Sequence, residues 1–338
     1  MLSPTAFELL IKYFDGVDSA VARRLSRKRP WLETALTSLL CDLLDDETQE
    51  DEPLDYTLGA LNTELRALDG LVEVHVRLET HEYPPAVERW VTQSDLGFVL
   101  EFNDLLLPDE SWTASWLLQA KRLYPQSRNP LRYSESSSFD GVDAEQKKRI
   151  DQLVQQVGLP FIKYLLYCPR PIQLDDATRL KLTYLRNRTL SGNIFDYTPG
   201  LQIHRELGLS DNSLAAGLFV VSPDELPNTF GQVHSQVLNG VTPFSWFLAQ
   251  QFAGGRPEVG HRNHDERLRR RPDAPDDDGP DYDWAHGIVT GDPCAVDRVL
   301  TVFQDRSQPI PFLPPHTLTV GVSIGRNIDP NERRIRLG

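Results

Sequence analysis

One short apolar segment, together with an acidic residue upstream of it, carries the side chains best suited to chemistry. Gln119 and Lys121 lie two positions apart in this segment, so on a strand their side chains project from the same face. Polar groups on one face of an apolar strand are costly unless that face serves a site. Asp95 begins another apolar segment. A carboxylate, an amide and an ammonium group at one sheet edge would suit a divalent metal and hydrolysis of a phosphodiester.

The elements that must position these residues are predicted from hydrophobic periodicity. Helical spacing of apolar residues over 17–44, interrupted by Pro30, predicts a helical region with a break. A second stretch with one apolar face, 144–156, predicts another helix. Alternating or continuous apolar residues predict strands over 71–79, 95–102, 114–123 and 160–168. The predicted order is therefore helix, three strands, helix, strand.

This order resembles the αβββαβ core of the restriction-endonuclease-like, or PD-(D/E)xK, superfamily. In that fold an acid lies near the start of the second strand and a (D/E/Q)xK pair lies on the third, which is where Asp95 and Gln119-Ala-Lys121 fall. The segment Glu33-Thr-Ala-Leu-Thr37 and the strand end Gln-Ala-Lys-Arg are also similar to those of nuclease-like proteins of bacteria. The resemblance covers residues 17–168 and implies an α/β fold with a metal-dependent nuclease site.

The resemblance also implies a role for each site residue. Asp95, Glu33, the amide of Gln119 and the carbonyl oxygen of Ala120 would be the metal ligands, and Mg²⁺ or Mn²⁺ would be the cofactor. A Gln amide is a weaker ligand than the Asp or Glu that is commonest at this position. Lys121 would orient or help deprotonate the attacking water and stabilise the charge that develops on the phosphate.

Two further positions bear on the site. Gln146, on the second predicted helix, resembles a helical Gln that several members of the fold place beside the active site, although a Gln on a solvated helix is also ordinary. Glu64 competes with Glu33 as the helical acid. We favour Glu33 because its apolar stripe is stronger and its spacing to Thr37 matches the family pattern.

The chain is expected to divide at about residue 170. Residues 1–170 would form the nuclease core, and residues 171–338 an accessory α+β region packed on that core. A Gly, Pro, Arg and Asp-rich segment near 254–283 is typical of a mobile loop. Within the accessory region we expect strands over 214–223 and 316–324, and helices over 242–252 and 295–304.

Charge leaves the nucleic-acid question open. The 338 residues carry a net charge of −14, which by itself argues against a nucleic-acid partner. Basic residues nevertheless cluster in 23–29 and 267–271, where they would contact phosphates or simply decorate the surface. DNA is the expected partner, RNA is an alternative, and a second copy or a partner protein of a defence complex is a further candidate. The expected nucleic-acid contacts are Arg122, Arg267, Arg269, Arg270 and Arg271.

The compartment is predicted from cysteines and hydropathy. Cys41, Cys168 and Cys294 are few, odd in number and far apart, which favours a reducing environment and no disulfide framework. The N-terminus lacks a signal-peptide pattern and no apolar run is long enough to cross a bilayer. We therefore expect a cytoplasmic protein with no membrane partner.

Three interpretations follow for Asp95 and for the face of the predicted strand that carries Gln119 and Lys121. The first is a Mg²⁺-dependent endodeoxyribonuclease, for which the resemblance implies a role in bacterial defence against foreign DNA. The second is a nuclease-like subunit that does not cut but binds nucleic acid or a partner protein. The third is structural: Asp95 is a turn residue, and Gln119 and Lys121 guard an edge strand against aggregation.

Overall fold

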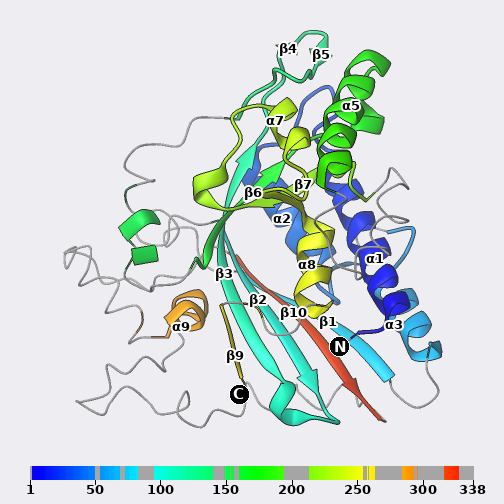
Figure 1. Cartoon of the computed structure of the whole chain (residues 1–338), viewed down its shortest axis with the longest axis vertical. Coiled ribbons are helices and arrows are strands. Elements are labelled where there is room, and N and C mark those ends of the chain that lie inside the picture. The colour runs from blue at the N-terminus through cyan, green and yellow to red at the C-terminus, as the bar shows by residue number, and fades with distance from the viewer. Residues whose placement is uncertain are drawn as a thin grey trace.

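A mixed sheet forms the centre of the molecule, in a computed structural model of the chain (Figure 1). The structure describes residues 2–49, 54–68, 73–82, 95–139, 160–193, 213–253, 259–262, 284–292 and 316–326, with residues 148, 150–152, 154, 155, 257 and 295. Seven strands follow one another in the order β1-β10-β2-β3-β6-β7-β8, and β9 pairs with β3 beside this path. The molecule is therefore a mixed α/β protein.

The strands of the path are β1 (Glu73–Glu82), β2 (Leu96–Asp104), β3 (Trp112–Arg122), β6 (Ile162–Tyr167), β7 (Leu218–Val221), β8 (Val241–Pro243) and β10 (His316–Gly325). β9 covers Gly260–Arg262, and the two short strands β4 (Ser127–Arg128) and β5 (Leu131–Arg132) form a separate hairpin. The described helices are α1 (Pro4–Ala22), α2 (Glu33–Leu43), α3 (Leu58–Ala67), α5 (Asp176–Asn193), α7 (Phe230–Ser235), α8 (Phe244–Ala253) and α9 (Trp284–Thr290). The described residues between 148 and 155 are also helical.

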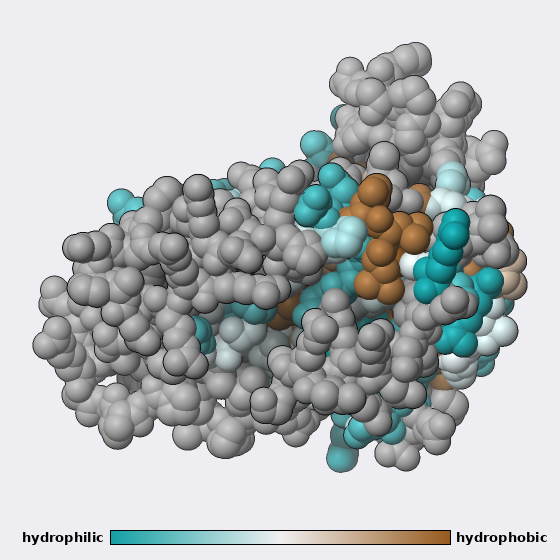
Figure 2. Space-filling model, turned by 90° about the horizontal axis from the view of Figure 1, so that it is seen from below, coloured by the Kyte–Doolittle hydropathy of each residue, from teal (hydrophilic) through white to brown (hydrophobic). Residues whose placement is uncertain are grey.

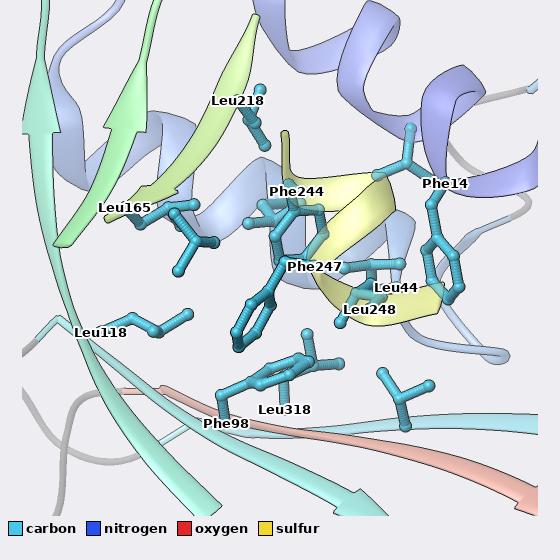
Figure 3. Packing of buried hydrophobic residues seen from close by; sticks show 14 of the residues in the cluster. Phe14, Leu44, Phe98, Leu118, Leu165, Leu218, Phe244, Phe247, Leu248 and Leu318 are labelled. Carbon is cyan, nitrogen blue, oxygen red and sulfur yellow. The ribbon is translucent and has the colours of Figure 1, made fainter. Parts of the chain in front are cut away.

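The strands expected around the candidate site are confirmed with small shifts at their ends. β2 pairs with β3 in the antiparallel sense, and β3 pairs with β6 in the parallel sense. Leu118 and Ala120 of β3 are buried, as the alternation along this strand predicted. The core on their side of the sheet is closed by α8 and α1 (Figure 3). There, Leu118, Leu165 and Phe98 point toward Phe244 and Phe247 of α8.

The first helix begins earlier than expected. The periodicity predicted helix from residue 17, whereas α1 begins at Pro4, where the Ser3 hydroxyl oxygen accepts a 3.2 Å hydrogen bond from the Ala6 backbone N–H. A Ser before a Pro is a favourable helix start, because the Pro has no N–H to leave unpaired. The break expected at Pro30 is found: residues 23–32 are not helical, and α2 follows them.

The C-terminal region differs from the accessory layer that we expected. β7 and β8 extend the sheet beyond β6, and β10 lies between β1 and β2. β10 is antiparallel to β1, with Glu73 opposite Gly325, and parallel to β2, with Leu96 opposite His316. These segments therefore share the sheet with the N-terminal half, and their main-chain hydrogen bonds are part of the same ladder.

The lower end of the sheet exposes apolar side chains. Figure 2 shows the molecule from below, where a hydrophobic area lies among hydrophilic residues. Three successive leucines that follow β2, Leu105 to Leu107, are between 45% and 62% exposed.

No helix in the described part of the chain is long and apolar enough to cross a membrane. Cys41 and Cys168 are buried free thiols, and Cys294 lies outside the described residues.

Candidate functional site

The register of β2 and β3 brings Asp95 level with Gln119. Leu96 lies opposite Leu118 in the antiparallel pair, and the Asp95 backbone N–H donates to the Leu118 carbonyl at 3.0 Å. Asp95 immediately precedes β2, so it extends the pairing by one residue. Two polar residues that are more than twenty positions apart in sequence thus meet at one point of the sheet.

The Asp95 carboxylate is held by donors from β3. Its Oδ2 atom accepts a short hydrogen bond from the Gln119 side-chain amide and a 2.7 Å bond from the Ala120 backbone N–H. Asp95 and Gln119 are each only 6% exposed. Buried polar groups need such partners, and hydrogen bonds to an ionised acceptor are about twice as strong as neutral ones. The pair is therefore a fixed structural unit at the start of β2.

Glu33 reaches the end of β3 from the neighbouring helix. It is the first residue of α2, and its Oε2 atom accepts a 2.9 Å hydrogen bond from the Arg122 backbone N–H. The Arg122 guanidinium donates to the Trp31 carbonyl at 2.7 Å. Both contacts join the start of α2 to the last residue of β3. Glu64, the alternative acid, lies on α3, where its carboxylate is 3.6 Å from the ammonium of Lys12 on α1.

The spacing of Glu33 and Thr37 has a structural explanation that the sequence did not provide. The Thr37 hydroxyl donates to the Glu33 carbonyl one turn earlier, at 3.2 Å, and lies 3.0 Å from the Tyr167 hydroxyl of β6. Burial raises the pKa of Tyr167 well above its ordinary value; the hydrogen bond to Thr37 lowers it, and nearby Cys41, Asp95 and Glu33 raise it. The two acids thus act on one buried phenol, which stays protonated and ties α2 to the sheet.

Lys121 lies two residues beyond Gln119 on the same face of β3. It is half-buried and opposite Leu166 of β6, while Gln119 is opposite Tyr164. Burial and the charge of Asp151 raise the pKa of Tyr164 to about 12. Asp151 belongs to the helical residues between 148 and 155, so this helix lies close to the face that carries Gln119 and Lys121.

The oxygen atoms near Asp95 can be compared with the needs of a magnesium ion. Among the described residues, no three His, Cys, Asp or Glu side chains form a metal-binding group. Asp95, Glu33, the Gln119 amide oxygen and the Ala120 carbonyl are all hard oxygen donors, the class that Mg²⁺ prefers. The Gln119 amide nitrogen faces Asp95, so a half-turn of this amide is needed to present its oxygen. With that rotation, the chemistry of the donor set, oxygen atoms alone, fits a magnesium ion.

Other expected site residues are placed differently or lie outside the described residues. Arg122 is 7% exposed, and its guanidinium lies 4.4 Å from the ring centre of Tyr124 besides its bond to Trp31. Its side chain is thus engaged in internal contacts, whereas a phosphate contact was expected. The remaining candidates, Gln146, Arg267, Arg269, Arg270 and Arg271, lie outside the described residues.

A second polar contact on this face of β3 was not foreseen. Ser115 is fully buried four residues before Gln119, and its hydroxyl lies 2.9 Å from Nδ1 of His286 on α9. The alternation along β3 places Ser115 on the face of Gln119, which is a signal the sequence did contain. The identity of its partner depends on tertiary packing, because α9 is far along the chain.

Comparisons of the chain with protein-family models, with curated proteins and with solved structures find no match. The function therefore rests on the geometry of the site. That geometry comprises a buried acid–amide pair, a lysine on the same face, and a second acid at the end of the strand.

Proposed function

We propose that this protein is a metal-dependent nuclease that hydrolyses DNA phosphodiester bonds. The observation that carries the proposal is the alignment of Asp95 with Gln119, with Lys121 two residues further along β3. Glu33 adds a second carboxylate at the end of the same strand. Acid, amide and lysine at the meeting point of two strands are the groups that such hydrolysis requires.

The proposal includes a restriction-endonuclease-like core. The succession β1, β2, β3, helix and β6 supports it, as do the antiparallel β2–β3 and parallel β3–β6 pairs. Two helices, α2 and α3, precede β1, where such a core has one. In such a core β1 and β2 are adjacent, whereas here β10 lies between them. We interpret β10 as a strand added to that core. A role in defence against foreign DNA is part of the same proposal and rests on the resemblance of the sequence motifs.

Each residue has a task in this proposal. A bound divalent metal would supply Lewis acidity and lower the pKa of a water molecule. Asp95 and Glu33 would hold that metal, and the Ala120 N–H fixes the orientation of the Asp95 carboxylate. The Lys121 ammonium would stabilise negative charge on the phosphate as the bond to the leaving oxygen breaks.

The test is cleavage of supercoiled plasmid and of linear duplex DNA, with Mg²⁺, with Mn²⁺ and with EDTA. Lys121→Ala should lower the cleavage rate by about 100-fold or more, the usual contribution of a positioned acid–base group. The matched control is Lys163→Ala, because Lys163 is a half-buried lysine on the neighbouring strand β6 that donates to the Ser222 hydroxyl at 3.1 Å. If Lys121→Ala cuts at the wild-type rate, the proposed site is wrong.

A second candidate function is a nuclease-like subunit that binds nucleic acid or a partner protein without cutting. The hydrogen bond from Gln119 to Asp95 favours it, because it satisfies the carboxylate without a metal. In that case Mg²⁺ would leave the melting temperature unchanged, and neither metal would support cleavage. A rise in melting temperature with Mg²⁺ that Asp95→Asn abolishes would exclude this alternative.

A further inference from the structure

We propose that a basic cleft beside the β4–β5 hairpin binds the phosphodiester backbone of a nucleic acid and leads it to the candidate site. This inference rests on the proposed function and assigns its substrate-binding surface. The cleft lies between the loop that joins α1 to α2 and the β4–β5 hairpin, and has a volume of about 1100 Å³. In Figure 1 the hairpin projects at the upper end of the molecule, near α5.

Positive charge comes from both walls of the cleft. Lys28 and Arg29 lie on the α1–α2 loop, and Arg128 and Arg132 lie on the hairpin. All four side chains are exposed, and none of them forms an ion pair within the described part of the chain. Four cations thus line one opening, and no carboxylate of the described residues forms an ion pair with them.

The acid that lines the cleft is already engaged. Asp175 accepts hydrogen bonds from the Thr178 backbone N–H at 3.0 Å and from the Thr178 hydroxyl at 2.9 Å, just before α5 begins. These bonds lower the pKa of Asp175, so it remains ionised and caps the helix. One carboxylate against four cations leaves the cleft positive, although the whole chain carries −14. Because salt screens charges beyond about 8 Å, a phosphate inside the cleft responds mainly to these local groups.

The cleft is joined to the candidate site by the chain itself. β3 ends at Arg122, and the first hairpin pairing follows at Gln126, whose N–H donates to the Arg132 carbonyl at 2.9 Å. Four residues span at most about 13 Å when extended. Counted from Gln119 the span is seven residues, or at most about 25 Å. Duplex DNA rises 3.4 Å per nucleotide of each strand, so a backbone that enters the cleft at Gln126 lies within about seven nucleotides of the site.

The two walls are also fastened to each other. The buried Tyr133, directly after β5, donates its hydroxyl proton to the Leu25 carbonyl at 3.1 Å, and Ser26 donates to the Gln173 side chain at 2.9 Å. A preformed cleft needs little ordering when a ligand binds, so its charges act without that cost. The shape and sign of the cleft therefore fit a phosphate backbone, and the contacts are to charge rather than to base sequence.

The experiment measures binding of a fluorescent 20-base-pair DNA duplex, and of an RNA of the same length, to the full chain in EDTA. The test variant is Arg128→Ala/Arg132→Ala. The matched control is Arg66→Ala/Arg326→Ala, which removes two exposed cations on α3 and after β10. The binding constant K falls with salt, and each lost phosphate contact makes the slope of log K against log salt concentration less steep by about 0.9. The slope of the test variant should therefore be less steep by nearly 2, and its affinity about tenfold or more lower. The control should bind like the wild type.

The outcomes separate this inference from the proposed function. If the test variant binds as the wild type does, or if the wild type binds neither polymer at 50 mM salt, the cleft is not the binding surface. If the test variant loses binding while the wild type never cuts, the cleft stands and the nuclease proposal falls. Where cutting occurs, the test variant should raise KM and Lys121→Ala should lower kcat. Tighter binding of RNA than of DNA would assign RNA as the substrate.

Discussion

Replacing Gln119 by Glu tests the acid–amide pair at the start of β2. At present the Gln119 amide donates to Asp95, and both residues are 6% exposed. Gln119→Glu puts a second carboxylate against the first. Two unit charges about 4 Å apart repel by about 4 kcal/mol at an effective dielectric constant of 20. Taking up a proton at pH 7 relieves the repulsion, but costs about 4 kcal/mol for a carboxyl with an ordinary pKa near 4.3. The expected loss of stability is therefore roughly 2 to 4 kcal/mol.

The assay is thermal unfolding in EDTA, supported by urea denaturation. For a chain of 338 residues, a loss of this size should lower the melting temperature by roughly 3 to 6 °C. The neighbouring carboxylate and burial raise the folded pKa of the introduced acid above its unfolded value. The destabilisation is thus small below about pH 4.3 and grows as the pH rises through neutrality. The deficit at pH 4.5 should therefore be well below the deficit at pH 7.

The control is the charge swap Asp95→Asn/Gln119→Glu, which restores one carboxylate and one amide. It should recover most of the stability, because the coupling between the two positions is what the single variant loses. The reasoning would be refuted if Gln119→Glu melted like the wild type at pH 7, or if the swap recovered nothing. Added Mg²⁺ should stabilise Gln119→Glu more than the wild type, because the variant offers the ion a third carboxylate beside those of Asp95 and Glu33.

Three further predictions concern residues around the site and in the core. Asp18→Ala should cost about 3 kcal/mol in urea unfolding, because it removes the buried acceptor of the Gly217 and Leu218 backbone N–H groups and one of the two carboxylates beside Arg170. His234 is fully buried, and burial and the charge of Arg186 lower its pKa to about 3. The unfolded chain therefore takes up a proton at His234 near pH 6.5, whereas the folded protein does so only near pH 3. The free energy of unfolding is thus unaffected by this residue above about pH 6.5 and falls as the pH drops toward 3. Between pH 7 and pH 5 the wild type should lose about 2 kcal/mol in free energy of unfolding through His234, and His234→Phe should not show this loss. A variant whose free energy of unfolding depends on pH as that of the wild type does would contradict this. Tyr167→Phe should cost about 1 kcal/mol in the same assay, because it removes the hydrogen bond between the Tyr167 and Thr37 hydroxyls.

The strands of the site could be predicted because their pattern is local. Along β3, Leu118 and Ala120 lie on one face and Gln119 on the other, and this period-two alternation is a direct consequence of strand geometry. The start of α1 was also encoded locally, in Ser3 and Pro4, but its helical periodicity was traced only from residue 17. α5 was not predicted, because charged and polar residues occur along its whole length and leave no clear apolar stripe.

The contacts of the site depend on tertiary structure and could not be predicted in the same way. Arg122 at the end of a strand was expected to contact phosphate, yet the carbonyl of Trp31, in the non-helical segment before α2, accepts its hydrogen bond. The basic cluster 23–29 was noted, but its convergence with Arg128 and Arg132 depends on how the hairpin folds back. Nothing in the local pattern of 316–324 indicates that this strand lies between β1 and β2.

The position of β10 has a consequence for how the chain folds. β1 and β2 are both complete before residue 105, but the strand that joins them begins only at residue 316. Until then each has an open edge, and open edges invite pairing with other chains. We therefore expect slow folding, dominated by contacts between distant parts of the chain, and aggregation of fragments that stop before residue 316. The strand that begins next to Asp95, β2, thus gains its second neighbour only after residues 316–325 have been synthesised.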